Sequence, residues 1–452
     1  MSRRGVKWSA VLLPVLWLPV VQAESLVDYV QQVRQTDPRF VMSEAAQDRD
    51  TARSDQMRAK LLPQVVLQGG WNRSEQDVFG SKIFDAGPTN GKKFIASVQQ
   101  PLLNIGSMYG YSASKAVVSQ TEKQKMQIQS EAMMDAIDRY LLALSAAEKL
   151  KLAREEESIA LKQLDQVQGL RDRQMATITD LLAIQARSDV LRVYRIRAEV
   201  EYRAAMDGLE QLTGEPVRGL QGLNDDQVTF AVEQPLSWWQ EKVAKANWAI
   251  QALEAGKEAA RLSVMQSKAA TLPVISLQVA TQQTDLGYQN NPVPRSRSNY
   301  AAVDITMPLF TGGGQLAAVH EASANERMAT MQYEKTSREI STRVKSSYMQ
   351  LQSLSAAISA AKRTVESTSQ SVAAKQRSYQ LGLESITYVL EAQRDFYAAQ
   401  RDFADVRHEF IRQWSVLNLY GASLDMEAVT LANAWLTQPV TVLLSESLST
   451  AT

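Results

Sequence analysis

Apolar residues recur at helical spacing through two very long stretches, residues 107–168 and 315–380. Both stretches lack proline and are rich in Ala, Gln, Glu, Lys and Met, which favour helices. At about 1.5 Å per residue, the first would span roughly 93 Å. Shorter helices are expected at residues 37–60, 179–213, 247–270 and 385–420. Two short helices placed end to end would match one long helix, so the sequence predicts a tall wall of uniform height.

The predicted long helices lack a single dense apolar stripe. In the first of them, the apolar residues are scattered among charged residues: Met126, Met133, Ile137, Leu141, Leu144 and Leu152. A compact bundle would need about three apolar positions in seven on one face. Narrow apolar seams instead suit a helix that touches neighbours on both flanks, with water on its inner and outer sides. A long antiparallel coiled coil is the alternative arrangement.

Four short segments, at about residues 62–73, 92–101, 272–284 and 299–309, alternate between apolar and polar or small residues. This period of two is typical of a strand between lipid and water. The side chains expected to face lipid are Val65, Leu67, Trp71, Ile275, Leu277, Val279, Val303 and Ile305. Polar loops at residues 74–91 and 285–298 would join the strands in pairs. Half-buried strands of a soluble domain are the alternative, and the alternation alone does not exclude them.

The whole pattern occurs twice along the chain. A Leu-Pro pair at residues 62–63 returns 210 residues later at 272–273, and Pro101 has its counterpart 207 residues later at Pro308. Aligning Ile178 with Ile386 gives an offset of 208 residues. The repeated unit is too long for a solenoid repeat, so each half is one large structural unit.

The duplication divides the chain into five parts. Residues 1–23 precede the first unit, which covers residues 24–216. A linker at residues 217–235 joins it to the second unit at residues 236–421. The tail at residues 422–452 has no counterpart in the first half, and we expect it to pack with the linker around the middle of the wall.

The first 23 residues have the features of a secretory signal peptide. Three basic residues, Arg3, Arg4 and Lys7, precede an apolar run at residues 8–21, and a small-residue cleavage site ends at Ala23. An uncleaved membrane anchor is the alternative, and it is disfavoured because two prolines interrupt the short apolar span. The sequence therefore predicts an exported chain that begins at Glu24.

The composition excludes several classes of protein. The chain has no cysteine, which excludes disulfides, thiolate metal sites and a lipid-modified N-terminal Cys. Its 49 basic and 49 acidic residues balance, so a nucleic-acid partner has no electrostatic basis. No later run approaches the roughly 18 apolar residues of a membrane helix, so any passage through a membrane would require a closed β-barrel.

No residue pattern points to catalysis, and we expect neither an enzyme nor a cofactor or metal site. The glycines at residues 312–314 are not followed by the Lys-Ser or Lys-Thr of a phosphate loop, and they fit a strand-to-helix turn. The two histidines, His320 and His408, are each isolated on a predicted helix, where a solvated or packed side chain is expected.

Six landmarks, in the same order in both halves, resemble the TolC family of outer-membrane exit ducts. They include the Leu-Pro strand starts, the Pro-Leu-Leu and Pro-Leu-Phe strand ends at Pro101 and Pro308, and the segment YQLGLESIT at residues 379–387. The resemblance covers the mature chain to about Gly421. It implies a mostly α-helical fold with a membrane β-barrel: three copies form one 12-stranded barrel, continued through the periplasm by a long α-helical barrel.

The resemblance also implies location and partners. The homotrimer would lie among outer-membrane lipid and extend into the periplasm of a Gram-negative bacterium. Its partners would be a periplasmic adaptor, or membrane fusion protein, and an inner-membrane transporter of the ABC type. Lacking an N-terminal lipid Cys, the chain resembles the protein-secretion branch, so the hypothesis is type I protein secretion. A duct for multidrug or small-molecule efflux is one alternative, and a non-transporting periplasmic coiled-coil scaffold is another.

In the family, a periplasmic gate lies at the two helix reversals, which we expect at residues 169–179 and 380–385. Gly169 and Gly382 would mark the tips that contact the adaptor. Tyr379 and Asp180 occupy the positions of a bonded Tyr and Asp, whereas Glu384 stands where the family has an Arg. The remaining expected gate residues are Tyr388 and Glu391 at the pore rings, and Arg171 or Arg173 as the cation for Glu384, within or across chains. The alternative is that these charges are only solvated turn residues.

Overall fold

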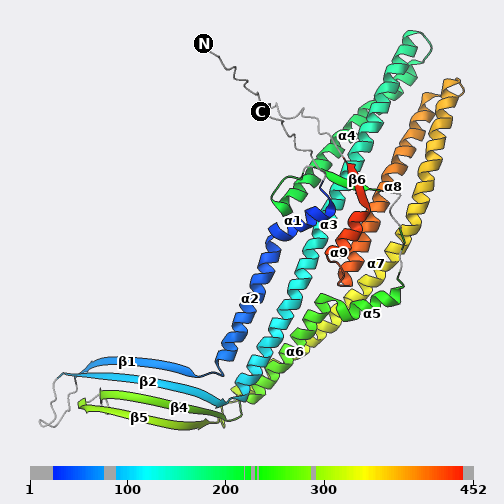
Figure 1. The fold of residues 1–452 in the computed structure, drawn as a ribbon. Coiled ribbons are helices and arrows are strands. Elements are labelled where there is room, and N and C mark those ends of the chain that lie inside the picture. The colour runs from blue at the N-terminus through cyan, green and yellow to red at the C-terminus, as the bar shows by residue number, and fades with distance from the viewer. Residues whose placement is uncertain are drawn as a thin grey trace, which may run out of the picture.

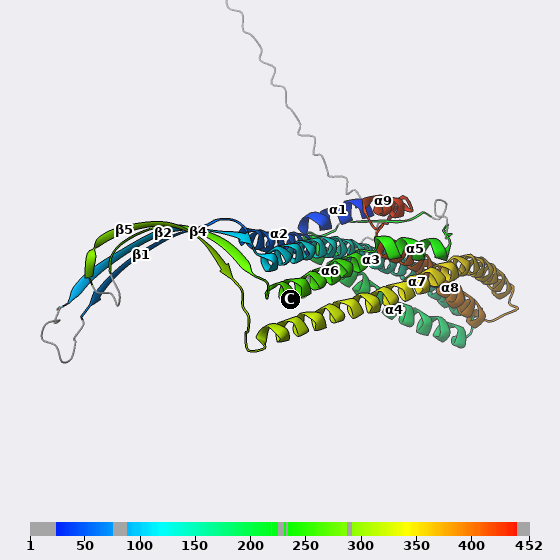
Figure 2. The ribbon, with the colours of Figure 1, turned by 90° about the horizontal axis from the view of Figure 1, so that it is seen from below.

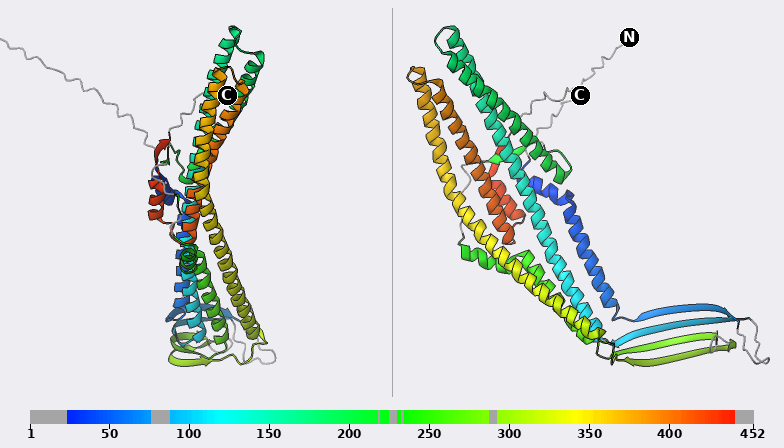
Figure 3. Two further views of the ribbon diagram at one scale, coloured as in Figure 1. Left: turned by 90° about the vertical axis from the view of Figure 1, so that its right-hand side faces the viewer. Right: turned by 180° about the vertical axis from the view of Figure 1, so that it is seen from behind.

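The computed structural model describes residues 24–75, 88–217, 219–224, 230–231, 234–286 and 292–440. The predicted signal peptide and the end of the tail lie outside these residues. The described chain forms an elongated wall of helices with a curved sheet at one end and two helical hairpin tips at the other (Figures 1 and 3). No helix in these ranges is both long and apolar enough to cross a membrane.

Two helices run the length of the wall, as the sequence predicts. α3 (Ile105–Asp172) and α7 (Gly314–Gln380) have 68 and 67 residues. α2 (Pro38–Ala59) and α4 (Ile178–Thr213) both pack along α3, while α8 (Ile386–Tyr420) packs on α7 and α6 (Trp248–Ala269) packs on both long helices. Each short-helix boundary lies within one residue of the prediction.

The structure repeats in the order that the duplication predicts. α1 (Leu26–Thr36), α2, two strands, α3 and α4 are followed by α5 (Leu236–Ala246), α6, two strands, α7 and α8. α1 and α5 are 11-residue helices that the sequence analysis did not predict. Asp37 and Asn247 end them and accept hydrogen bonds from backbone N–H groups in the first turns of α2 and α6.

The sheet is built from both repeats. β1 (Gln64–Ser74), β2 (Thr89–Leu103), β4 (Val274–Leu286) and β5 (Pro292–Thr306) lie in that order, and all neighbours are antiparallel. The strands extend into the predicted loops, because residues 292–298 pair with the end of β4 although they are polar. An exposed polar strand forms as readily as an apolar one when its backbone is paired, so side-chain polarity marked the boundary in the wrong place.

The register gathers the predicted outward side chains on one face of the sheet. Val65 pairs with Val98, and Val98 pairs with Val279. Leu277 pairs with Val303, and Ile275 with Ile305. Since successive residues alternate between faces, the eight side chains named above share one face. Most of them are exposed in the single chain, including Val65, Leu67 and Ile305 at 76%, 73% and 68%.

A small layer covers the middle of the wall on one side. It consists of α1, α9 (Met426–Ala434) and a two-stranded sheet of β3 (Leu220–Leu223) and β6 (Leu436–Val440) (Figure 2). The pairing of β3 with β6 joins the linker to the tail, as the sequence predicts. The Tyr140 hydroxyl accepts from the Gln221 backbone N–H and donates to the carbonyl of Glu24, at 2.8 and 2.9 Å.

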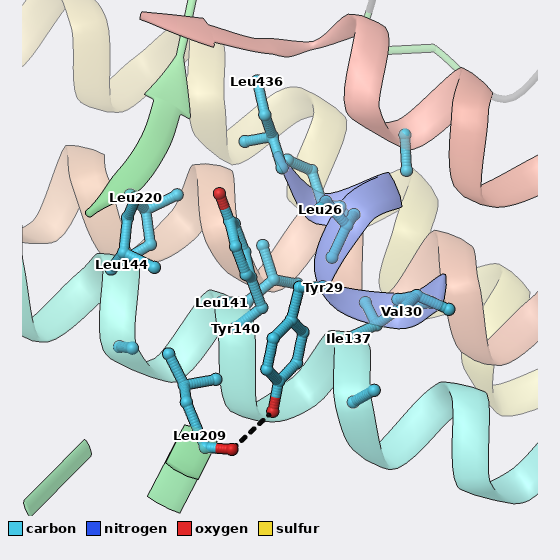
Figure 4. Packing of buried hydrophobic residues seen from close by; sticks show 14 of the residues in the cluster. Leu26, Tyr29, Val30, Ile137, Tyr140, Leu141, Leu144, Leu209, Leu220 and Leu436 are labelled. Carbon is cyan, nitrogen blue, oxygen red and sulfur yellow. Dashed lines mark hydrogen bonds between the residues drawn. The ribbon is translucent and has the colours of Figure 1, made fainter. Parts of the chain in front are cut away.

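The layer encloses the largest buried apolar cluster, in which α1, α3, α4, β3 and β6 meet (Figure 4). Tyr29 and Tyr140 lie at its centre with ring centroids 5.9 Å apart, and the Tyr29 hydroxyl donates to the carbonyl of Leu209. Leu26, Leu144 and Leu220 are fully or almost fully buried around them. A local apolar core therefore stabilises the middle of the wall. The flanks of the described wall have no dense apolar stripe.

The two repeats meet along an ionic seam between α3 and α8. Buried Glu156 on α3 accepts from Arg187 on α4 at 2.5 Å and from Arg401 on α8 at 3.2 Å. Further along the same antiparallel contact, Lys149 pairs with Asp405 at 2.8 Å and Arg412 pairs with Asp138 at 3.2 Å. The acids and bases on these helices are therefore placed by antiparallel packing, which the sequence analysis did not predict.

Glu148 and His408 form a second buried part of this seam. His408 Nε2 lies 3.5 Å from a Glu148 oxygen, and Arg407 lies 3.4 Å from the other oxygen. Burial alone would raise the pKa of Glu148, but the contact with His408 and the charges of His408 and Arg407 outweigh it and lower that pKa. His408 is thus packed within the wall, while His320 is exposed.

Removing the central carboxylate of the seam should destabilise the wall. Glu156→Ala leaves Arg187 and Arg401 without their acceptor, and we expect a loss of roughly 2 kcal/mol, below the about 3–5 kcal/mol of a fully buried pair because Arg401 is partly exposed. Chemical denaturation followed by circular dichroism measures the change. Glu241→Ala removes an exposed pair with Lys245 and should leave the transition unchanged. Equal effects of the two changes would contradict a structural role for the seam.

Candidate functional site at the helix tips

The first helix reversal lies between α3 and α4 and does not use Gly169. Gly169 lies inside α3, and Gln174 takes the left-handed conformation with φ of 61°. The Met175 N–H donates to the carbonyl of Leu170 and the Gln174 N–H to that of Arg171, both at 2.8 Å. This is a Schellman motif, in which glycine usually occupies the left-handed position. The turn lies within the predicted reversal at residues 169–179, but its left-handed residue is Gln174 and not Gly169.

The second reversal has the same motif with glycine in place. Gly382 has φ of +73°, the Leu383 N–H donates to the carbonyl of Ser378, and the Gly382 N–H donates to that of Tyr379, both at 2.9 Å. α8 then begins at Ile386. The two tips are built alike, although their left-handed residues differ.

A cavity of about 970 Å³ lies between the two tips. Both helical hairpins line it, and its wall includes four predicted gate residues, Arg173, Asp180, Tyr379 and Glu384, and both predicted tip residues, Gly169 and Gly382. An apolar cluster closes its base, where Val167 and Ile184 of the first hairpin meet Ile386 and Val389 of the second. The fold thus brings together residues that are about 200 positions apart in the sequence.

Asp180 is engaged within its own helix start. Its Oδ2 accepts from the Thr177 backbone N–H at 3.2 Å and from the Thr177 hydroxyl at 2.6 Å, while its own N–H donates to Thr177 Oγ1. This reciprocal capping box fixes the first turn of α4. One oxygen of Asp180 is therefore held by the cap, and the carboxylate is oriented at the cavity wall.

Tyr379 lines the same cavity from α7. Partial burial, and then the negative charge of Asp180, raise the pKa of the Tyr379 hydroxyl above its usual value. Within the residues that the structure describes, no hydrogen bond joins Tyr379 to Asp180. The single chain therefore places both groups on one cavity without linking them.

Glu384 has a cation within its own chain, and it is neither Arg171 nor Arg173. Lys375 Nζ lies 2.6 Å from Glu384 Oε1 and 5.2 Å from the centre of the Tyr388 ring. Arg171 and Arg173 are exposed and form no ion pair with Glu384 among the described residues. The predicted pairing is thus not made within a chain, because α7 supplies a nearer cation.

Lys375 is the residue of the candidate site that the sequence analysis missed. It precedes Tyr379 by four residues, which places both side chains on one face of α7. That spacing was a usable signal. The two expected pore-ring residues, Tyr388 and Glu391, are both exposed on α8. The described residues contain no group of three or more His, Asp or Glu side chains that could hold a metal ion.

A family model described as "Outer membrane efflux protein" matches residues 29–215 and 239–421. The two matched segments correspond to the two structural repeats. Alkaline protease secretion protein AprF of Pseudomonas aeruginosa is 26% identical over 415 residues, covering 89% of this chain and 85% of AprF. Outer membrane protein TolC of Escherichia coli is 23% identical, covering 95% of this chain and 90% of TolC.

A further curated relative and two solved structures agree with these matches. Proteases secretion protein PrtF of Dickeya chrysanthemi is 22% identical, covering 84% of each chain. A crystal structure of CusC has a TM-score of 0.78 at 17% identity, covering 90% of this chain and 94% of CusC. The outer-membrane channel OprN has a TM-score of 0.77 at 17% identity, covering 89% and 90%. These structures share the fold of the chain.

Substitutions at the reversals should separate the observed turn from the predicted one. Gln174→Gly relieves a left-handed Gln and should stabilise the first hairpin by about 1 kcal/mol, whereas Gly382→Ala should destabilise the second by about 1–2 kcal/mol. Gly169→Ala should stabilise α3 by about 0.5–1 kcal/mol, since open space surrounds it. Denaturation midpoints measure all three. A destabilising Gly169→Ala would place the turn at Gly169 after all.

Proposed function

The chain belongs to the outer membrane efflux protein family, and from this premise we propose that it is the exit duct of a three-part system for type I protein secretion. As a member of this family it is an outer-membrane channel that extends into the periplasm, and it is a transport duct rather than an enzyme. The proposal adds the oligomer, the gate, the partners and the cargo class.

The four-stranded sheet carries the proposal. β1 and β5 are its edges, and within the described chain their outer backbone groups pair with no other strand. In lipid, each unpaired amide would cost several kcal/mol, so the edges must pair with other copies. The apolar face would then turn to lipid and the opposite face to the channel. Three copies would supply the 12 strands of one barrel, and four strands alone are too few to close.

The helical wall would continue the duct through the periplasm. α3 and α7 are about 100 Å long at 1.5 Å per residue, and their flanks carry narrow seams suited to neighbouring copies. The hairpin tips, around Gly169, Gln174 and Gly382, would meet a periplasmic adaptor. An ABC-type inner-membrane transporter would deliver the cargo to this end.

We place the gate of the duct at the cavity between the tips. Tyr379 and Asp180 face it from different hairpins, and a small inward movement would join them. Lys375, Glu384 and Tyr388 would hold the second tip in position. Each exposed pair contributes at most about 1 kcal/mol, but three copies around one axis would multiply the effect.

Protein cargo is favoured over small molecules by two relatives. AprF and PrtF are both named for the secretion of proteases, and each matches most of this chain. Deleting the chain from its host should remove one or more proteins from the culture medium, while tolerance to toxic small molecules stays unchanged. The opposite outcome would favour an efflux duct.

The orientation of the sheet can be tested by two adjacent substitutions. Val279 is exposed on the apolar face, and Gln278 lies on the other face. Val279→Arg should hinder assembly in the outer membrane, because a lipid-facing Arg near the midplane costs about 2–4 kcal/mol. Gln278→Arg would face the channel and should assemble normally. Membrane fractionation measures both, and equal assembly would mean that the proposed faces are wrong.

The Tyr379–Asp180 latch can be tested by single-channel conductance in planar bilayers. Tyr379→Phe combined with Asp180→Ala removes both partners and should raise the conductance of the closed duct. Since Asp180 also caps α4, Tyr379→Phe alone is the matched variant, because it removes the donor of the latch and leaves the cap intact. A double variant that conducts like the parent would exclude the latch.

Glu384 and Lys375 should act as one unit. Glu384→Gln and Lys375→Gln each break the 2.6 Å pair, and either should raise conductance to a similar degree. Combining them should add little beyond the single changes, since coupled residues are not additive. If Glu384→Gln raised conductance but Lys375→Gln did not, the cation that pairs with Glu384 would come from elsewhere, such as Arg171 or Arg173 of another copy.

A further inference from the structure

Four cations lie together at the far end of the apolar face of the sheet. Arg73 follows Trp71 on the same face of β1, and Lys92 is the cross-strand partner of Trp71. Arg297 pairs with Gln283, which itself pairs with Phe94. Arg295, two residues from Arg297, shares its face. The far end of the apolar face therefore carries Trp71 and Phe94 interspersed with a basic cluster of Arg73, Lys92, Arg295 and Arg297.

The basic cluster occurs on one face of the four-stranded sheet and at the end far from the helices. On the opposite face of the strands, the charged residues are Lys93 and Asp304. Nearer to the helices, the apolar face has no charged residue in its paired strands. Since alternation separates adjacent residues, Lys92 and Lys93 are neighbours in the chain but lie on opposite faces.

The four cations are exposed and have no ion pair within the described residues. Two carboxylates lie near the four cations: Asp285, which shares their face by alternation and accepts from the backbone N–H of Lys92, and Glu75, directly after β1. Arg295 is held over the face by Gln283, whose amide oxygen can accept from its Nε and Nη2 at 2.5 Å. The described part of this end thus carries an excess of positive charge.

The height of the cluster matches a membrane surface. Ten residues separate Arg297 from Met307, which continues the apolar alternation at the helical end of the sheet. At about 3.3 Å per residue and a tilt of about 40°, they span roughly 25 Å, the height of the apolar band of a membrane barrel. Because the helices lie in the periplasm, the cations would stand at the headgroups of the outer leaflet.

We propose that this basic cluster binds the phosphate groups of the phosphorylated glycolipid, lipid A, in the outer leaflet. The inference rests on the proposed orientation of the sheet in the membrane. Arg side chains can bind phosphate through two parallel hydrogen bonds, and each cation near an anionic surface contributes about as much as a fivefold change in affinity. In three copies, the clusters would form a ring that fixes the depth of the duct.

The test uses the full-length protein with phosphatidylcholine vesicles that contain either lipid A or its dephosphorylated form. Vesicle flotation first reports insertion, and the apparent affinity for lipid A is then measured by titration. Replacing all four cations by Gln should leave insertion intact and weaken lipid A binding at least about tenfold. Dephosphorylated lipid A should bind the parent and the variant equally weakly.

Lys93→Gln is the matched control, because it removes a neighbouring charge from the other face and should bind like the parent. If the fourfold variant does not insert, Arg295→Gln with Arg297→Gln should still weaken binding at least about fivefold. Equal binding of lipid A by inserted parent and variant would overturn the inference, as would full displacement by inorganic phosphate. If the parent itself fails to insert, the proposed function is wrong and the inference falls with it.

Discussion

The backbone hydrogen bonds at the edges of the sheet constrain the rest of the molecule. β1 and β5 come from different repeats, and within the described chain each has one edge without a partner strand. In lipid those edges must be closed by other copies, and closure fixes how the copies stand around an axis. The helices that follow the strands in the chain are then arranged around the same axis. A wall with narrow seams on its flanks, rather than a compact bundle, is what such helices can form.

The interactions along the wall differ with height in a way that suits a duct. At its middle, Tyr29 and Tyr140 anchor a dense apolar core under the layer of α1, α9, β3 and β6. Between the repeats, the contact of α3 with α8 is largely ionic, with Glu148 and Glu156 at its centre. At the tips only a small apolar cluster and exposed polar pairs remain. The extent of buried apolar packing therefore decreases from the middle toward the proposed gate.

The sequence predicted the long elements well because periodicity and repetition both constrained them. The absence of proline and the 208-residue offset located α3, α7 and their short partners, and strict alternation placed Val65, Val279 and Ile305 on one face. The short helices α1, α5 and α9 were missed, since 9 to 11 residues give too few turns for a periodic signal. The pairing of linker with tail was expected, but not its strands.

The site was harder to predict than the fold, for local reasons. Gln174 occupies a left-handed position that glycine usually occupies, so the reversal at residues 169–179 was predicted but its tip was assigned to Gly169. Glu384 was predicted to pair with an arginine of the other helix reversal. Its partner within the chain is instead Lys375, which lies nine residues before it on α7. Asp180 and Tyr379 reach the same cavity as the family pattern implies, but no hydrogen bond joins them in the described chain.

Native mass spectrometry of the detergent-solubilised protein tests the central claim most directly, because closure of the sheet requires other copies. The full chain has a mass of 50.2 kDa. The account predicts a single species of three mature chains that persists on dilution, with no folded monomer. A stable monomer that retains its strands in detergent would contradict it, since the edges of β1 and β5 would then be satisfied without partners.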